Sequence, residues 1–190
     1  MRNDKLFWVV QGVLKYLPFD ATRRLRSWAY RPFFLRCGTN VRIEDGVTIK
    51  YPSEIEVGDN TVINQNCFLV GLGGLRIGRD VMMGNNSSVI TTTHVTDSID
   101  VPMRQQGVVS RATTIGDDVW IGSGVAIQGG AHIQSHSIVG AGAVILGRSY
   151  PPYAVLGGVP GRVLKMRSGA PPESSASPSE VLDSSVATNS

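Results

Sequence analysis

The stretch that decides the fold runs Ile115-Gly-Asp-Asp-Val-Trp-Ile-Gly-Ser-Gly-Val-Ala-Ile-Gln-Gly-Gly-Ala-His-Ile-Gln-Ser-His-Ser-Ile-Val-Gly-Ala-Gly-Ala-Val-Ile145. An aliphatic residue returns at every sixth position of this stretch. Six residues turn an α-helix by about 600°, so successive aliphatic side chains would lie about 120° apart and share no face. Glycine and aspartate also interrupt the stretch too often for a long strand. The spacing therefore indicates a repeat architecture.

The same period occurs earlier in the chain, in three groups that are offset from one another by eight residues instead of six. The groups are Ile43 and Ile49, then Val57, Ile63 and Leu69, then Ile77, Met83 and Val89. Insertion of two residues at one corner of each coil explains both offsets. Three hexapeptides make one triangular coil of a parallel β-helix. The 22 glycines and the low aromatic content of 7% fit many regular turns around a thin aliphatic core.

A sandwich of short antiparallel strands is the alternative fold. Such strands alternate apolar and polar residues and vary in length, whereas the register here survives six consecutive hexapeptides. The sequence therefore predicts an all-β parallel β-helix. The gap from Val89 to Ile115 exceeds one repeat by about twenty residues, so we expect a loop insertion at about 91–112. This insertion contains His94.

The two ends of the chain have a different composition. Apolar residues between Leu6 and Leu17 recur at three- and four-residue spacing, which predicts a helix ended by Pro18. A second helix is expected from about Ala21 to Tyr30, and together the two would cover one open end of the array. We divide the chain into a helical cap (1–36), a hexapeptide-repeat β-helix (37–167) and a Ser-rich tail (168–190), which is predicted to be disordered.

The net charge of +3 arises largely from an arginine cluster near the N-terminus. A basic, partly apolar segment of this kind suits peripheral contact with an anionic membrane surface, or it is simply a solvated flank. The apolar segment is too short to span a bilayer, and no signal-type cleavage site follows it. Cys37 and Cys67 have no metal or disulfide spacing. We expect a cytoplasmic protein, with the inner face of the membrane as one location, and no nucleic-acid partner.

Three stretches together carry a resemblance to a known family. They are Met83-Gly-Asn-Asn-Ser-Ser-Val-Ile-Thr-Thr-Thr-His94, Ile115-Gly-Asp-Asp-Val-Trp-Ile-Gly-Ser123, and Val139-Gly-Ala-Gly-Ala143 continued by Gly157-Gly-Val-Pro-Gly-Arg-Val-Leu-Lys165. In order and spacing they resemble the hexapeptide-repeat acyltransferases of the maltose, galactoside and cell-surface-polysaccharide O-acetyltransferase type. The resemblance implies a left-handed helix, a homotrimer, and acetyl-CoA bound in the groove between adjacent subunits. The left hand comes from the resemblance alone, because periodicity gives no hand.

Acetyl transfer to a hydroxyl group needs a base, and histidine suits that task near neutral pH. The resemblance assigns this role to His94, and its place in the one long insertion agrees with a functional loop on a rigid scaffold. The resemblance places Asn86 against the acceptor, although a turn residue is the alternative. Trp120 is expected to line the groove beside the pantetheine arm, or to be a packing residue on the outer face.

The coenzyme needs backbone amides along a groove and a few cations for its phosphates. The resemblance implies backbone contacts from Ser123 and Ala141, a far end near Gly147 and Arg148, and phosphate partners in Arg162 and Lys165. Surface solvation is the alternative for these cations. The sequence has no Walker-type phosphate loop and no G-x-G-x-x-G motif, so ATP and NAD chemistry lack support.

A second hypothesis adds His132 and His136 to His94 as three zinc ligands on a trimeric β-helix, as in hydratases that resemble carbonic anhydrase. The histidine-flanking motif of that family is absent, and no metal is predicted. Our interpretation is an O-acetyltransferase that moves an acetyl group from acetyl-CoA to a hydroxyl of a sugar, an oligosaccharide or a surface-polysaccharide precursor. An N-acyltransferase of an amino sugar or antibiotic, and a non-catalytic trimeric scaffold, remain the alternatives.

Overall fold

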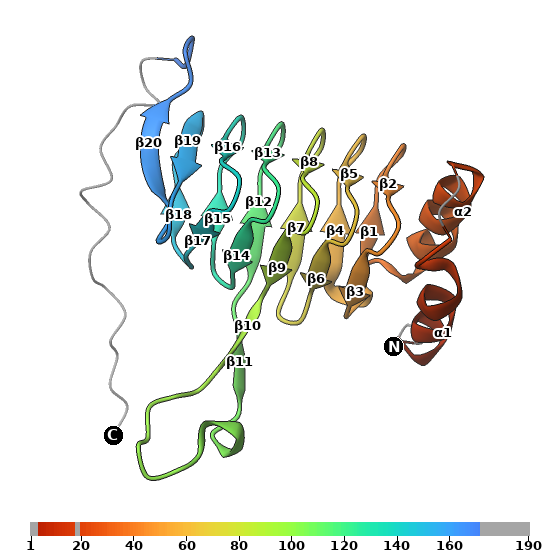
Figure 1. The fold of residues 1–190 in the computed structure, drawn as a ribbon, viewed down its shortest axis with the longest axis horizontal. Coiled ribbons are helices and arrows are strands. Elements are labelled where there is room, and N and C mark those ends of the chain that lie inside the picture. The colour runs from red at the N-terminus through yellow and green to blue at the C-terminus, as the bar shows by residue number, and fades with distance from the viewer. Residues whose placement is uncertain (1–3, 18–19, 172–190) are drawn as a thin grey trace.

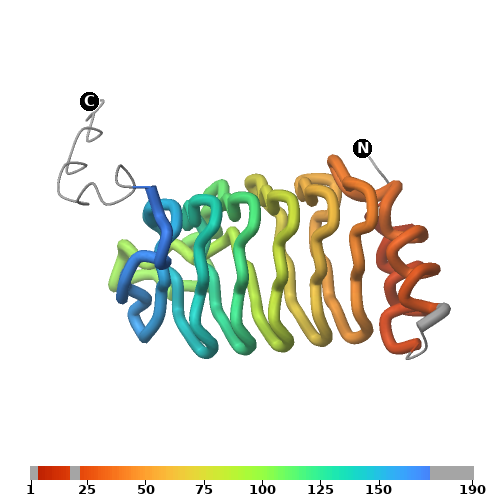
Figure 2. The backbone as a smooth tube through the Cα atoms, turned by 90° about the horizontal axis from the view of Figure 1, so that it is seen from above, coloured from red at the N-terminus to blue at the C-terminus, as the bar shows by residue number. Residues whose placement is uncertain are grey.

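The computed structural model describes residues 4–17 and 20–171, and the predicted tail from residue 172 onward lies outside this part. The chain winds as a solenoid of short parallel strands, with two helices across its N-terminal end (Figure 1). Seen from above, the coils stack one on another along a single axis (Figure 2). The predicted all-β parallel β-helix with an N-terminal helical cap is confirmed. The left-handed sense stays an expectation from the family resemblance.

Three sheets form the walls of the solenoid. Sheet A holds β1 (Arg36–Cys37), β4 (Ile55–Val57), β7 (Leu75–Ile77), β12 (Thr113–Ile115), β15 (His132–Ile133) and β18 (Ser149–Tyr150). Sheet B holds β2 (Arg42–Ile43), β5 (Val62–Ile63), β8 (Met82–Met83), β13 (Trp120–Ile121), β16 (Ile138–Val139), β19 (Ala154–Gly157) and the antiparallel β20 (Arg162–Met166). Sheet C holds β3 (Thr48–Lys50), β6 (Phe68–Val70), β9 (Ser88–Ile90), β14 (Ala126–Gln128) and β17 (Val144–Ile145).

The predicted hexad positions all point into the solenoid. On sheet B the predicted Ile43, Ile63, Met83, Ile121 and Val139 stack in register from coil to coil, each with at most 1% of its surface exposed. Leu156, which the period did not predict, continues this column. A stacked column of this kind removes each aliphatic side chain from water, which stabilises the fold by about 1.5–3 kcal/mol per side chain. The period of six in the sequence is therefore the period of this core.

The corners turn through left-handed backbone conformations. At the corner between sheets B and C the turning residues are Gly46, Asn66, Asn86, Gly124 and Gly142, all with positive φ. Asparagine and glycine tolerate this region best. Gly122 precedes one of these turns, and a Cβ on it would lie 2.6 Å from the backbone nitrogen of Ala141 in the next coil. The close stacking of coils therefore requires small residues at such positions.

The corner between sheets C and A is where coil length varies. Two coils carry extra residues there, as the 3₁₀-helix η2 (Pro52–Glu54) and as the turn through Gly73 and Gly74. The same corner releases the long insertion, which leaves as β10 (Thr92–His94), forms η3 (Met103–Gln105) and returns as β11 (Val108–Ser110). Strands β10 and β11 pair antiparallel, a hairpin that the period of six could not reveal.

The helical cap consists of α1 (Asp4–Leu14), α2 (Asp20–Tyr30) and η1 (Arg31–Phe33). Helix α1 ends three residues before the predicted Leu17, because the Lys15 carbonyl accepts a hydrogen bond from Gly46 N–H at 2.8 Å in the first coil. Phe7 packs against Tyr30 and Phe33, with ring centroids 5.2 Å away in each case. Within the described residues, no helix is both long and apolar enough to cross a membrane.

Polar side chains of the cap bind the open edge of the first coil. The buried Gln11 accepts a hydrogen bond from Ile49 N–H at 2.7 Å, and Ser27 Oγ accepts one from Ile43 N–H at 3.0 Å. The buried Arg26 donates from Nε to the Ile43 carbonyl at 3.2 Å. A sheet edge left bare would expose such groups to pairing with another chain. The cap thus ends the ladder by hydrogen bonding and not only by apolar cover.

This arrangement predicts the effect of replacing Gln11 by leucine. The variant Gln11→Leu keeps the volume but leaves the buried Ile49 N–H without an acceptor, which costs about 1–3 kcal/mol of unfolding free energy. Chemical denaturation should show this loss, while the matched exposed change Gln105→Leu in η3 should leave the unfolding midpoint nearly unchanged. An unaltered midpoint in Gln11→Leu would contradict the role given to this side chain.

Candidate functional site

His94 lies at the end of β10, on the hairpin that leaves the solenoid between sheets C and A (Figure 1). It pairs with Val108 of β11, and the next ladder bond runs from Val95 N–H to the Gly107 carbonyl at 3.2 Å. Its imidazole is exposed and makes no hydrogen bond or ion pair within the described part of the chain. The ring nitrogens are therefore available to a substrate.

The root of the hairpin is tied to the solenoid by Thr91. The Thr91 hydroxyl is buried and lies 2.9 Å from the Val70 carbonyl and 2.7 Å from the Leu72 carbonyl of the preceding coil. The Thr91 carbonyl accepts a hydrogen bond from Arg111 N–H at 2.8 Å where the chain returns. Both legs of the hairpin are thus held at one point, which positions His94 relative to sheet C.

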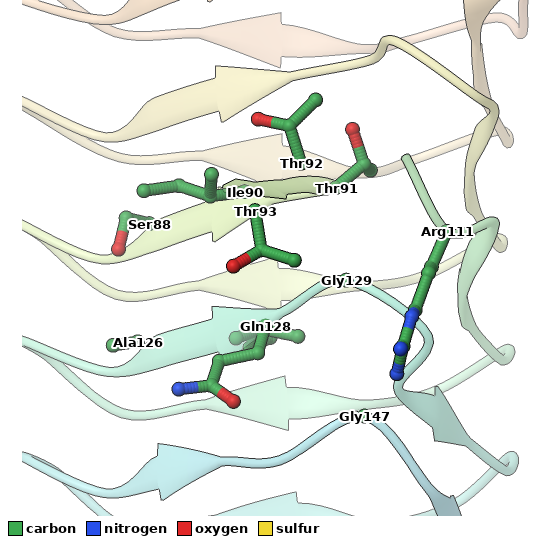
Figure 3. Close-up of a pocket in the computed structure, with 11 residues that line it drawn as sticks. Ser88, Ile90, Thr91, Thr92, Thr93, Arg111, Ala126, Gln128, Gly129 and Gly147 are labelled. Atoms are coloured by element: carbon green, nitrogen blue, oxygen red, sulfur yellow. The ribbon is translucent and has the colours of Figure 1, made fainter. Parts of the chain in front are cut away.

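A hollow of about 430 Å³ lies beside this root, on the outer face of sheet C (Figure 3). Its lining is mostly polar or small and comprises Ser88, Ile90, Thr91, Thr92, Thr93, Arg111, Ala126, Ile127, Gln128, Gly129 and Gly147. The side chain of Arg111 extends past Gly129 toward Gly147 (Figure 3). Of the residues predicted to hold the coenzyme, this hollow contains Gly147. A Cβ on Gly147 would collide with the Gly129 carbonyl, so packing also requires glycine there.

Arg111 lines this hollow, although it is not among the binding residues predicted from the sequence. It is exposed, and its guanidinium has no hydrogen bond or ion pair among the residues that the structure describes. One feature of the sequence could have identified Arg111 as a candidate, which is that it is a basic residue at the end of the insertion, where the chain returns to the solenoid. A guanidinium in a hollow of this kind can bind a phosphate or carboxylate by two parallel hydrogen bonds.

A second group of predicted residues lies along the corner between sheets B and C. Asn86 occupies one of the left-handed turns, with φ of 59°, and its side chain is exposed. Ser123 and Ala141 stack one coil apart at the same corner, where the Ser123 carbonyl accepts a hydrogen bond from Gly142 N–H at 2.9 Å. At this position Asn86 can both form the turn and contact an acceptor, so the two interpretations of this residue do not exclude each other.

Trp120 stands on the outer face of sheet B, with 52% of its surface exposed. It lies in register between Met82 and Ile138 of the neighbouring strands. A hollow of about 550 Å³ runs along this face and is lined by Trp120 and Met82 together with polar side chains that include Arg42, Asn64 and Gln65. The indole is thus an apolar wall on the surface and not part of the core.

The three basic residues that are predicted to bind the coenzyme differ in their surroundings. Arg148 already donates to the Gly161 carbonyl at 2.8 Å and to the Tyr150 hydroxyl at 3.2 Å, so part of its donor set stabilises the C-terminal end of the solenoid. Arg162 and Lys165 lie on β20 opposite Gly157 and Val155, are exposed, and have no ion pair within the described chain. Of the three, Arg162 and Lys165 are the cations whose charge is open to a ligand.

One chain does not bring all of these residues together. The C–A side carries His94, Arg111, Gly147 and Arg148, whereas the B–C corner and sheet B carry Asn86, Trp120, Ser123 and Ala141. Asn86 precedes β9 and His94 follows it, so the two are at opposite ends of the same coil wall.

The other two histidines have partners of their own. His132 Nδ1 lies 2.9 Å from Thr114 Oγ1, and His136 Nδ1 lies 2.9 Å from Asp118 Oδ2 while its ring stacks on Tyr153 at 4.8 Å. The hydrogen bond with His136 holds the pKa of Asp118 below its ordinary value. In the part of the chain that is described, no group of three or more His, Cys, Asp or Glu side chains is placed to hold a metal ion.

Comparison with known proteins agrees with this architecture. Residues 112–147 match the family model of the bacterial transferase hexapeptide (six repeats). The chain is 34% identical over 141 residues to galactoside O-acetyltransferase of Escherichia coli K12, covering 74% of this chain and 68% of that protein. Its fold is similar to a maltose O-acetyltransferase from Clostridium difficile 630, with a TM-score of 0.78, 26% identity and 86% of each chain covered.

A further solved structure carries a ligand. It is the hexapeptide-repeat acetyltransferase VCA0836 of Vibrio cholerae O1 biovar eltor, complexed with acetyl coenzyme A, with a TM-score of 0.74, 25% identity and 86% of each chain covered. The period of six, the parallel solenoid and the likeness to galactoside O-acetyltransferase over two thirds of that enzyme lead to one assignment. The chain belongs to the hexapeptide-repeat acetyltransferases and is an enzyme of that family.

Proposed function

We propose that this enzyme transfers an acetyl group from acetyl-CoA to a hydroxyl of a sugar, an oligosaccharide or a surface-polysaccharide precursor, with His94 as general base. The observation that carries the proposal is the His94 imidazole, which is exposed and has no partner among residues 4–17 and 20–171, on a hairpin whose root is fixed beside a polar hollow. The names of the relatives support the acceptor class, since one acetylates a galactoside and another maltose. A cytoplasmic location remains a prediction.

The reaction requires the protein to position the two substrates and to supply one general base. Neutral His94 accepts the proton of the acceptor hydroxyl while the oxygen of that hydroxyl attacks the thioester carbonyl of acetyl-CoA. The tetrahedral intermediate then collapses to the acetyl ester, and the departing thiolate of CoA takes the proton back from His94. Histidine can accept and return a proton near neutral pH, because its two forms are then close in free energy.

The separation of His94 from Asn86 and Trp120 supports a homotrimer in which each active site lies between two copies. A hairpin that projects from one chain can reach the outer face of a neighbour. That face carries exposed Met82 and Trp120 side chains, which a monomer would leave in water. Three copies related by a rotation axis close into a ring and give three equal sites.

Acetyl-CoA would lie in the groove between such copies. Backbone groups at Ser123 and Ala141 would line one wall of this groove, and the hollow with Gly147 and Arg111 would form part of the other. Arg162 and Lys165, exposed on β20, would pair with the phosphates of the coenzyme, as would Arg111. Arg148 then acts mainly by holding the Gly161 carbonyl.

His94→Ala should abolish transfer while leaving assembly and acetyl-CoA binding intact, because the imidazole acts only on the acceptor proton. Loss of a general base typically costs about 10² to 10⁴ in rate. Thiol release from acetyl-CoA, measured against a panel of hydroxyl and amine acceptors, gives the rate. The variant should also lose the lower, imidazole-like limb of the rate against pH.

The matched control is Val108→Ala, which alters the strand partner of His94 and keeps the imidazole. It should retain most of the activity and the pH limb. A folded His94→Ala enzyme with near-normal turnover would show that the proposed mechanism is wrong, and preference for amine acceptors would favour an N-acyltransferase.

Mixing two inactive variants tests whether the site is shared between copies. His94→Ala chains and chains with both Asn86→Ala and Trp120→Ala should be nearly inactive alone. When they are refolded together in equal amounts, about a quarter of the intersubunit sites receive intact residues from both neighbours, and activity should recover to that extent. No recovery in particles that sediment as trimers would place the site within one chain, and an active monomer would exclude the homotrimer.

Arg162→Ala and Lys165→Ala should mainly raise the KM for acetyl-CoA, by several-fold to tens-fold each, because one charge-assisted hydrogen bond contributes about 1.5–3 kcal/mol. Arg76→Ala is the control, since Arg76 is an exposed cation on sheet A that pairs with Glu56 at 3.3 Å. Initial rates over a range of acetyl-CoA and acceptor concentrations separate the two constants. An effect confined to the acceptor KM would move both residues out of the coenzyme site.

A further inference from the structure

The helical cap exposes an unusually apolar outer surface. The inner side of α1 carries Phe7 and Gln11, which are buried against the first coil. On the opposite side and in the turn that follows, Val9, Val13 and Tyr16 have 64%, 66% and 70% of their surface exposed. A surface helix normally carries polar residues on the side away from the core. Helix α1 instead exposes apolar side chains on the side that faces away from the core.

Helix α2 also exposes a large apolar side chain, the indole of Trp28. Trp28 is 73% exposed and lies on the side opposite the buried Arg26 and Tyr30. Arg24 precedes it by one turn and Arg31 follows it by one turn, and both are exposed. Since the inner sides of α1 and α2 contact the first coil, their outer sides face away from the solenoid at its N-terminal end (Figures 1 and 2).

The charge of the protein is concentrated in the same region. Residues 1–36 hold eight of the 18 Lys and Arg residues but two of the 15 Asp and Glu residues. The remainder of the chain therefore has ten basic against thirteen acidic residues and is net negative. A basic cap on an acidic body would orient this end toward an anionic surface.

We propose that the helical cap docks this enzyme on an anionic membrane surface. The docking face consists of Trp8, Val9, Val13, Tyr16, Leu25 and Trp28. Apolar and tryptophan side chains at the interface, combined with Lys and Arg around them, are the features by which helices lie along a bilayer. With 11 residues, α1 is about 16 Å long, so it lies on the surface and does not cross it.

This inference goes beyond the proposed acetyl transfer and does not depend on its chemistry. The cap lies at the N-terminal end of the solenoid, while β10, β13 and β14 lie further along it (Figure 1). His94 is on β10, Trp120 is on β13, and β14 lines the hollow on sheet C. In the proposed homotrimer, rotational symmetry places three caps at the same end, so that three weak contacts act together.

The test is sedimentation of the full-length enzyme with lipid vesicles. We expect binding to phosphatidylcholine vesicles that contain phosphatidylglycerol, and weaker binding to phosphatidylcholine alone and at high salt. The double variant Val13→Ser/Trp28→Ala should bind at least about tenfold more weakly, since it removes two apolar side chains from the contact. Ile99→Ser is the matched control, because Ile99 is 99% exposed in the insertion.

The charge is tested in the same way with Arg24→Gln, which should weaken binding to the anionic vesicles, against Arg104→Gln, which should not. Thiol release with a soluble acceptor, measured without vesicles, should be unchanged in the double variant and in Arg24→Gln, and so separates docking from catalysis. Absence of binding by the unaltered enzyme, or equal binding by the double variant, would overturn the proposal. A double variant that binds no less but sediments as a monomer would show that this face is an interface between copies.

Discussion

The structure depends on one constraint, which is that strands of two or three residues are stable only through hydrogen bonds to the coils above and below. The ladder runs without interruption along each wall, as from Gly78 N–H to the Ile115 carbonyl at 2.8 Å and from Gly116 N–H to the Ile133 carbonyl at 2.8 Å. Such a ladder keeps its register only if every coil turns at the same places. Left-handed corner residues and inward aliphatic side chains are therefore required in each repeat.

The same constraint decides where chemistry can lie. Inward positions on the strands are filled mainly by aliphatic side chains, and two of the three corners keep a nearly constant length from coil to coil. Only the corner between sheets C and A varies, and it accepts η2, the turn at Gly74 and the long hairpin with His94. An insertion there costs little, because strands β9 and β14 still pair across it as Val89 with Ile127. His94, the proposed general base, thus lies at the corner of the solenoid whose length varies.

The hexapeptide period predicted the coils, the two-residue excess after Ile49 and Leu69, and the insertion. A different signal, the three- and four-residue spacing of apolar residues, predicted a helical cap. The sequence could not predict pairing that depends on contacts outside the period. The hairpin of β10 and β11, the guanidinium of Arg148 on the Gly161 carbonyl, and the entry of Arg111 into the hollow on sheet C all arise from such contacts. The separation of His94 from Trp120 likewise follows from the winding of the chain, which a list of motifs does not contain.

The cap buries two polar side chains beside its aromatic core and exposes several apolar ones, and these two features have different causes. Its inner side must satisfy the N–H and carbonyl groups at the open edge of the first coil, so Gln11 and Arg26 are buried there. Polar groups on the outer side would suffice for a cap that faced only water, yet Trp28 and Val13 are exposed on it. The need to end the ladder explains why Gln11 and Arg26 are buried, but it does not explain why Trp28 and Val13 are exposed. In the proposed docking, the apolar side chains of the outer side would lie in surroundings less polar than water, and the flanking arginines would face the negative charge of the membrane surface.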